Sequence, residues 1–246
     1  MDAVYEQYAR EMHDRYGYFA IWLPSSRVAL GDVGVFVDDR FEKITTLAAL
    51  GIPFFTEPAG HVTHLDYSSA KAVQVSTEGS AALGDTSTAA LTISFGRKGA
   101  TFFQAAQSRE EKLANLHLLE AELRRLHQLK RWSLDHLVVN TVLHTGPTVI
   151  FVSNERDAQV ALDVRADLLG SPIPIAQASG QLSITRRSGL AANVVAPDGL
   201  TPLFRAVQMK KRLGRDVSIQ FRGDDEIGLV PVEWEDIEPH RPMATS

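Results

Sequence analysis

Short runs in which apolar and polar residues alternate recur along this chain, and they constrain its fold more than any other feature. The apolar positions of the two clearest runs are Leu91, Ile93 and Phe95, and Val160, Leu162 and Val164. Successive side chains of a strand point to opposite faces, so a period of two predicts strands with one buried face. Further runs of this kind, separated by turn residues, predict a mainly antiparallel, twisted sheet.

The first residues have a helical period instead. Within residues 2–16, Val4, Tyr8 and Met12 fall on one face, and charged residues fall on the opposite face. An apolar stripe of this kind predicts a helix that packs one side against the sheet. We expect Tyr8 and Met12 to be buried there.

A second helical period lies in the middle of the chain. The leucines that recur there at spacings of three and four residues are Leu113, Leu116, Leu119, Leu123, Leu126 and Leu129. Ser108, followed three residues later by Glu111, has the capping-box pattern that marks a helix start. We therefore expect an α+β fold class: a single domain with a twisted, mainly antiparallel sheet, an N-terminal helix and a long central helix.

Turn residues divide the expected strands. Tight turns are expected at residues 38–39 and 96–99, and another turn at residues 145–147 between two strands. Residues 79–90 are rich in Gly, Ser, Thr and Ala, and we expect them to form a polar, flexible connection. A last strand is expected at residues 217–221.

The composition excludes several classes of protein. The chain has no cysteine, which rules out disulfides, thiolate metal sites and a cysteine nucleophile. The first residues lack the apolar core of a signal peptide, and no run approaches the roughly 18 apolar residues of a transmembrane helix. If the protein enters a membrane, it must therefore do so as strands.

The candidate chemical motifs do not point to catalysis. His61, His64 and Asp66 could supply three metal ligands, but they lack the helical spacing of a metalloprotease pair, and loop histidines are the favoured interpretation. No Gly-x-Ser-x-Gly elbow and no phosphate-binding glycine loop occurs. We expect no catalytic residue, no cofactor and no metal ion, and predict that the protein is not an enzyme.

The charge of the chain reverses near its C-terminal end. Residues 205–222 hold six basic residues and one acid, whereas residues 223–246 hold seven acids and one arginine. The basic residues that we expect to form a positive surface are Lys210, Lys211, Arg212 and Arg215. The whole chain has a net charge of −5, so we expect no nucleic-acid partner.

An acidic segment after a basic strand suggests a cover for a positive surface. We expect a domain over residues 1–222 and an acidic C-terminal tail over residues 223–246, held by the apolar side chains Val232, Trp234 and Ile237. Acidic tails are also commonly just solvated, and this second interpretation stays open.

The order of these elements resembles the bacterial gasdermins. The resemblance is carried by the segments "VALGDVGVF", "FEKITTLAAL", "LTISFGRKGATFFQAA", "HLVVNTVLHTGPTVIFVS" and "TPLFRAVQMKK". It implies a cytoplasmic protein of antiviral defence and cell death, autoinhibited by its C-terminal tail. An activating protease would remove the tail, after which the protein would self-associate, bind membrane lipid and insert β-hairpins into the inner membrane. Members commonly carry a lipidated cysteine near the N-terminus, and this chain has none.

The alternating pattern, considered together with the physics of the bilayer, indicates candidate strands for entry into a membrane. Strands can cross a bilayer only where all their backbone polar groups are paired, and about 9 to 11 residues suffice for a crossing. The alternating runs at residues 91–95 and 160–164 are the membrane-inserting candidates, within possible hairpins at residues 70–106 and 137–165. The alternative is a half-buried sheet in a non-enzymatic protein-binding or regulatory module of a bacterial defence or signalling system.

Overall fold

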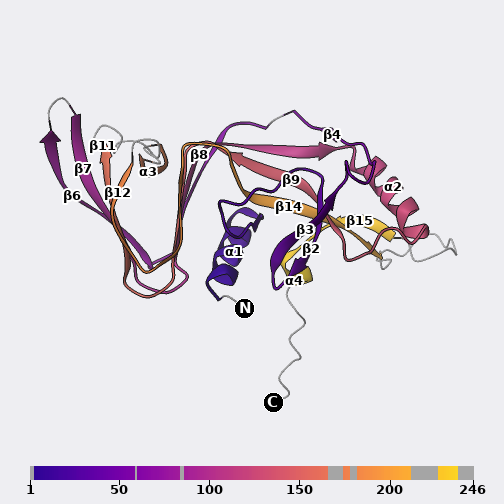
Figure 1. Cartoon of the computed structure of the whole chain (residues 1–246), viewed down its shortest axis with the longest axis horizontal. Coiled ribbons are helices and arrows are strands. Elements are labelled where there is room, and N and C mark those ends of the chain that lie inside the picture. Colours follow the sequence, from indigo (N-terminus) through magenta and orange to yellow (C-terminus); the bar gives the residue numbers. More distant parts are fainter. Residues whose placement is uncertain are drawn as a thin grey trace, which may run out of the picture. The chain divides into compact units, whose positions relative to one another are not determined.

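The computed structural model describes residues 3–58, 60–83, 86–165, 174–177, 182–211 and 227–237 (Figure 1). It consists mainly of antiparallel strands with a few helices, which confirms the expected α+β fold class. None of the described helices is both long enough and apolar enough to cross a membrane.

The chain divides into two compact units, each assembled from three separate stretches. The first unit comprises Met1–Arg27, Ala59–Glu110 and Leu143–Leu203, and the second comprises Val28–Pro58, Glu111–Val142 and Phe204–Ser246. Because the stretches interleave, strands β8, β9 and β14 have residues in both units.

The first unit contains α1 and most of the strands. Its elements are α1 (Ala3–Tyr16), β1 (Phe19–Ala20), β5 (Thr63–Ser68), β6 (Val73–Leu83), β7 (Thr86–Phe95), most of β8 (Thr101–Ala114), β10 (Thr148–Ser153), β11 (Ala158–Arg165), α3 (Pro174–Gln177), β12 (Ser183–Ser188) and β13 (Leu190–Ala196).

The second unit contains the long helix and the C-terminal elements. Its elements are β2 (Asp32–Val37), β3 (Arg40–Thr46), β4 (Phe55–Thr56), α2 (Leu116–Gln128), most of β9 (Leu137–Thr145), most of β14 (Leu200–Lys211), β15 (Ile227–Pro231) and α4 (Trp234–Ile237).

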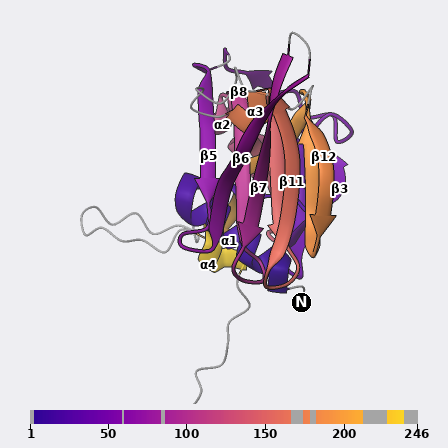
Figure 2. The ribbon, with the colours of Figure 1, turned by 90° about the vertical axis from the view of Figure 1, so that its left-hand side faces the viewer.

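The strands form two sheets. The larger has eleven strands, with the order β1-β14-β9-β8-β10-β13; in addition β15 pairs with β14, β2 pairs with β3 and β9, and β4 and β5 pair with β8. The smaller sheet has four strands in the order β12-β11-β7-β6, which lie side by side in Figure 2.

The N-terminal helix has the predicted position and burial. Tyr8 and Met12 are fully buried, and the aromatic rings of Tyr5 and Tyr8 lie 5.5 and 6.2 Å from that of Trp22. Burial, followed by the effect of Tyr5, raises the pKa of the Tyr8 hydroxyl. The apolar stripe therefore correctly predicted which face of the helix is buried.

The predicted start of the long helix is wrong. Ser108 lies buried inside β8, opposite Thr63 of β5, and α2 begins only at Leu116. Asn115 precedes the helix in a left-handed conformation and makes no side-chain cap. Pairing with β5 satisfies the backbone around Ser108, so this non-local partner overrides the local capping pattern. Leu119, Leu123 and Leu126 are buried as the stripe predicts, whereas Leu113 belongs to β8 and Leu129 is 54% exposed.

The polar connection expected at residues 79–90 is instead a hairpin. β6 and β7 pair from Val73 opposite Phe95 to Leu83 opposite Thr86. Backbone pairing with the neighbouring strand therefore outweighs the low strand propensity of the small residues in this segment. The tight turn at residues 38–39 is confirmed, and both aspartates have positive φ angles, 48° and 63°.

Residues 145–147 do not join two paired strands. β9 and β10 are each neighbours of β8 rather than of each other, so residues 137–165 do not form one hairpin. Gly146 donates its N–H to the carbonyl of Ala106, and Ala106 donates to the carbonyl of Pro147. The short helix α3 was not predicted, and the strand expected at residues 217–221 lies outside the described residues.

Candidate functional site

Two adjacent hairpins form the four-stranded sheet of the first unit. β6 pairs with β7 and β11 pairs with β12, while β7 and β11 join the hairpins along eight antiparallel residue pairs from Ala158–Phe95 to Arg165–Thr88. The second hairpin is thus β11–β12 and not the segment 137–165. β6 has 11 residues and β7 has 10, which matches the length that a tilted strand needs to cross a bilayer.

The first hairpin continues through a bend into a second pair of strands. β5 and β8 pair up to Ser68 opposite Phe102, and β6 and β7 resume the pairing at Val73 opposite Phe95. The interruption consists of residues 69–72 on one arm and residues 96–100 on the other, and we call it the first bend.

The second hairpin has the same construction. β10 and β13 pair up to Ser153 opposite Leu190, and β11 and β12 resume at Gln159 opposite Ser188. The second bend consists of residues 154–157 and Gly189, and the N–H of Asn154 donates to the carbonyl of Gly189 at 2.7 Å. Gly189 has a φ of 66°, and a Cβ there would lie 2.4 Å from a carboxylate oxygen of Glu155.

The apolar residues of the predicted inserting strands share one buried face. Leu91, Ile93, Phe95, Val160 and Leu162 are each at most 3% exposed and belong to one cluster. Ile93 lies opposite Val160, and Leu91 lies opposite Leu162. Val164 lies opposite Ala89 in the register, but its side chain is outside the part of the chain that is described.

Elements outside the small sheet cover this face. The same cluster contains Ile175 of α3, Phe102 of β8 and Phe151 of β10, and the last two rings are stacked with centroids 6.3 Å apart. The N–H of Ala176 also donates to the side-chain oxygen of Gln104. Burying each large apolar side chain contributes about 1.5–3 kcal/mol. Exposing this face to water would lose that contribution, so the face can be uncovered only if it contacts another apolar environment.

The opposite face and the edges of the small sheet are more open to solvent. Thr92 and Ser94 are half-buried and Gln159 is exposed. Val75 of β6 lies opposite Ile93 and so belongs to the apolar face, yet it is 49% exposed. Edge strands such as β6 and β12 present backbone groups that can pair with another chain.

The C-terminal segment is bound within the second unit. β15 pairs with β14 from Val207 opposite Pro231 to Lys211 opposite Ile227. The side chain of Arg124 donates to the carbonyl of Ile227 at 2.9 Å, and Glu120 accepts from the N–H of Leu229 at 3.2 Å. These two residues of α2 also form an ion pair with each other at 2.6 Å.

Two of the three apolar side chains that were predicted to hold this segment are buried. Val232 is 6% exposed and Trp234 is 5% exposed, whereas Ile237 is half-buried. The N–H of Val232 donates to the carbonyl of Ala206 at 3.0 Å. The segment is therefore held by apolar burial and backbone pairing together.

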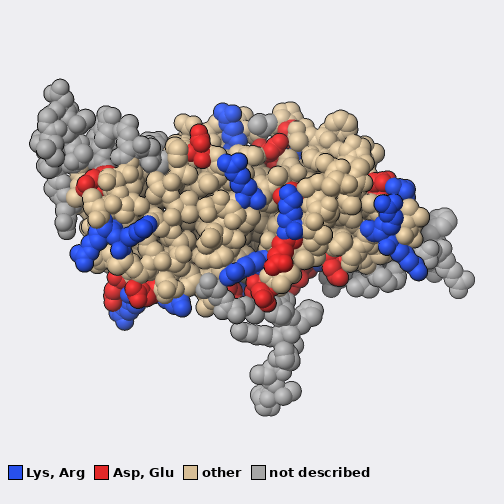
Figure 3. Space-filling model, viewed as in Figure 1, with Lys and Arg blue, Asp and Glu red and all other residues tan. Residues whose placement is uncertain are grey.

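One acid of the segment contacts the predicted basic surface. Asp236 forms an ion pair with Lys210. Burial acts to raise the pKa of Asp236, but the backbone N–H of Glu233 and the Lys210 ammonium outweigh it and hold the pKa below its ordinary value. The side chain of Lys211 and residues Arg212 and Arg215 lie outside the described residues. On the face in Figure 3, basic and acidic side chains are interspersed.

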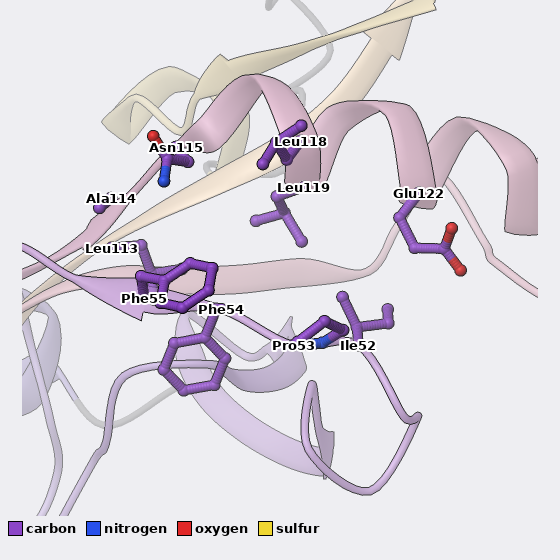
Figure 4. Close-up of a pocket in the computed structure, with 10 residues that line it drawn as sticks. All are labelled: Ile52, Pro53, Phe54, Phe55, Leu113, Ala114, Asn115, Leu118, Leu119 and Glu122. Carbon is purple, nitrogen blue, oxygen red and sulfur yellow. The ribbon is translucent and has the colours of Figure 1, made fainter.

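An apolar pocket of the second unit was not anticipated from the sequence. It has a volume of about 190 Å³ and lies between α2 and residues 52–55 (Figure 4). Leu118 and Phe55 at its margin are 56% and 64% exposed. No local pattern marks such a pocket, because its walls come from segments distant in the sequence.

The candidate metal ligands do not form a cluster. Among the described residues, no group of three histidine or acidic side chains is placed to hold a metal ion. The ring Nδ1 of His64 instead accepts a hydrogen bond from the N–H of Gln107 at 3.2 Å. His64 and Asp66 belong to β5, and Asp66 lies opposite Gln104 of β8.

Comparison with known proteins does not assign the chain to a family: no family model matches it, and no curated protein matches it.

Proposed function

We propose that this chain is an autoinhibited pore-forming protein of the gasdermin type. After a protease removes its C-terminal segment, the protein self-associates and inserts the hairpins β6–β7 and β11–β12 into a membrane. The observation that carries this proposal is the four-stranded sheet: two adjacent bent hairpins share one apolar face, and among the described strands β6 and β12 form the edges of the sheet.

The apolar face supplies the surface that would contact lipid. In a membrane, strands alternate between lipid-facing apolar residues and polar residues on the other side. Leu91, Ile93 and Phe95 alternate in this way with the half-buried Thr92 and Ser94. Self-association through the edges of β6 and β12 would pair the remaining backbone groups, as the bilayer interior requires.

The C-terminal segment supplies the restraint. Cleavage between β14 and β15 would turn an intramolecular contact into an intermolecular one, which lowers its occupancy at protein concentrations far below the effective concentration of a tethered segment. Loss of residues 223–246 leaves 24 basic and 23 acidic residues, so the net charge changes from −5 to +1. That change favours approach to an anionic membrane surface. We place the intact protein in the cytoplasm and the cleaved protein at the inner membrane.

The second candidate function is a non-enzymatic protein-binding or regulatory module. The exposed margin of the apolar pocket, with Phe55 and Leu118, favours it. An exposed apolar patch of this kind commonly marks a site of protein contact.

Dye release from liposomes tests the proposal. A specific protease site is inserted between Gly223 and Asp224, and release of the peptide after cleavage is checked by size-exclusion chromatography. We expect cleaved protein to release the dye, while intact protein and a variant with a scrambled site exposed to the same protease do not. If cleaved, peptide-free protein leaves anionic and neutral liposomes intact, the proposal is wrong and the binding module is favoured.

A further inference from the structure

Glu11 of α1 places its carboxylate against the first bend. Glu11 is buried, with 9% of its surface exposed. Its Oε1 accepts hydrogen bonds from Arg97 at 2.5 Å and from Gln7 at 2.8 Å, and its Oε2 accepts from the Ser69 hydroxyl at 2.7 Å. Arg97 and Ser69 belong to the two different arms of the first bend, so a single carboxylate holds both arms.

The contacts of Glu11 extend across the bend. The Ser69 hydroxyl accepts from the N–H of Thr101 at 2.8 Å, and the N–H of Ser69 donates to the carbonyl of Thr101 at 2.9 Å. Ser69 and Thr101 are at most 1% exposed. Burial, then the charge of Glu11 and a hydrogen bond to it, raises the pKa of Tyr67 to about 12.

Ser153 connects the first bend to the second. Its hydroxyl donates to the carbonyl of Arg97 at 2.7 Å and accepts from the N–H of Ala100 at 2.9 Å. Its carbonyl accepts from the N–H of Gly99 at 2.9 Å. Ser153 is fully buried at the end of β10, directly before the second bend. One hydrogen-bond network therefore runs from α1 through the first bend to the start of the second.

We infer that Glu11, Ser69, Arg97 and Ser153 form a latch that keeps both hairpins bent, and that the latch must open at Glu11 before the hairpins can straighten. This inference rests on the proposed function. If β5–β6 and β7–β8 become continuous strands, residues 69–72 and 96–100 must change conformation. The contacts of Ser69 and Arg97 with one carboxylate cannot then both persist.

The hydrogen bonds of the latch are expected to be strong and to break together. Hydrogen bonds to a buried carboxylate are charge-assisted and therefore stronger than neutral ones. Losing Arg97 leaves the Glu11 carboxylate as a buried charge without its ionic partner, so separation of Arg97 alone is disfavoured. The latch is distinct from the contacts of the C-terminal segment, which are made within the second unit.

An engineered disulfide tests the latch directly. A Cβ built on Gly99 would lie 3.2 Å from the Cβ of Gln7, close to the Cβ–Cβ separation of about 3.5–4.5 Å in disulfides. In the double variant Gln7→Cys and Gly99→Cys these are the only two cysteines, because the chain has none of its own. Gly99 has a φ of 73°, and the resulting strain is common to the oxidised and reduced forms, so the two can be compared.

With the C-terminal segment removed, we expect the oxidised variant to release no dye and the reduced variant to release it. Both forms lack the hydrogen bond from Gln7 to Glu11, so this loss does not affect the comparison. Equal release by the two forms would overturn the latch while leaving the pore proposal intact. Absence of release by the unmodified cleaved protein would overturn the pore proposal instead, and the latch is then judged by a measurement that needs no membrane.

That measurement is amide hydrogen exchange of the intact chain with Glu11→Gln. The matched control is Asp14→Asn, which makes the same charge change at an exposed position of α1. We expect the amides of Gly99, Thr101 and Ser153 to exchange about tenfold or more faster in Glu11→Gln, while those of β2 and β3 in the second unit keep their rates. If the bend amides of Glu11→Gln exchange at the same rate as those of the Asp14→Asn control, the latch is contradicted. If all amides of the chain exchange faster to the same degree, Glu11 has only a structural role and the latch is also contradicted.

Discussion

Two kinds of contact hold the C-terminal segment, and their magnitudes differ. The ion pair between Lys210 and Asp236 has side chains that are 35% and 27% exposed, and pairs this open to solvent contribute about 0–1 kcal/mol. Trp234 is 5% exposed, and complete burial of a large apolar side chain contributes several times more. At the scale of single residues, the tryptophan therefore dominates the restraint that the proposed autoinhibition requires.

Replacing Trp234 by Ala should weaken this restraint. We expect the free energy that holds the segment in place to fall by about 3–5 kcal/mol, because truncating a buried aromatic residue leaves a cavity. Exchange of the β15 amides should become faster, and dye release should begin sooner after cleavage. Glu235→Ala, at an exposed position of the same helix, is the matched control. Identical behaviour of the two variants would mean that Trp234 does not hold the segment.

At the scale of elements, the two hairpins carry the functional proposal. Their inner face is covered by α3, β8 and β10, whereas Val75 on β6 is half-exposed on that same face. Gln74 is its exposed neighbour on the opposite face, where Ser94 is its partner in β7. Val75 and Gln74 thus report on the two faces of the sheet, and because both are exposed, substituting them leaves the core intact.

Arginine at these two positions should separate the faces. Val75→Arg should oppose insertion by about 2–4 kcal/mol near the bilayer midplane, because a charged side chain on a lipid-facing position is strongly unfavourable. Gln74→Arg should have a smaller effect, since its side chain would face water. Dye release by the cleaved variants is the measurement, after circular dichroism shows that both are folded. Equal release by the two would refute this assignment of faces.

At the scale of the whole molecule, local patterns and non-local pairing explain which predictions succeeded. The helix with Tyr8 and Met12 and the strand with Leu91, Ile93 and Phe95 were predictable, because periodicity is a property of consecutive residues. The start of α2 was not, since β5 converts the segment around Ser108 into a strand.

The same distinction applies to the candidate site. The apolar residues of β7 and β11 and the buried residues Val232 and Trp234 could be named from the sequence. The partner of β11, the two bends and the network around Glu11 could not, because they depend on segments that meet only in the folded chain. Nor does the sequence mark the two units, whose stretches interleave.

The most direct test of the central claim measures whether the hairpin face enters lipid. A single cysteine replaces Val75 in one variant and Gln74 in another, and each carries an environment-sensitive fluorophore; the absence of native cysteines makes the labelling specific. After cleavage in the presence of liposomes, we predict a blue shift at position 75 and quenching by nitroxide-labelled lipid, whereas the probe at position 74 stays accessible to aqueous iodide. Probes at both positions that remain quenched by iodide alone would contradict the account.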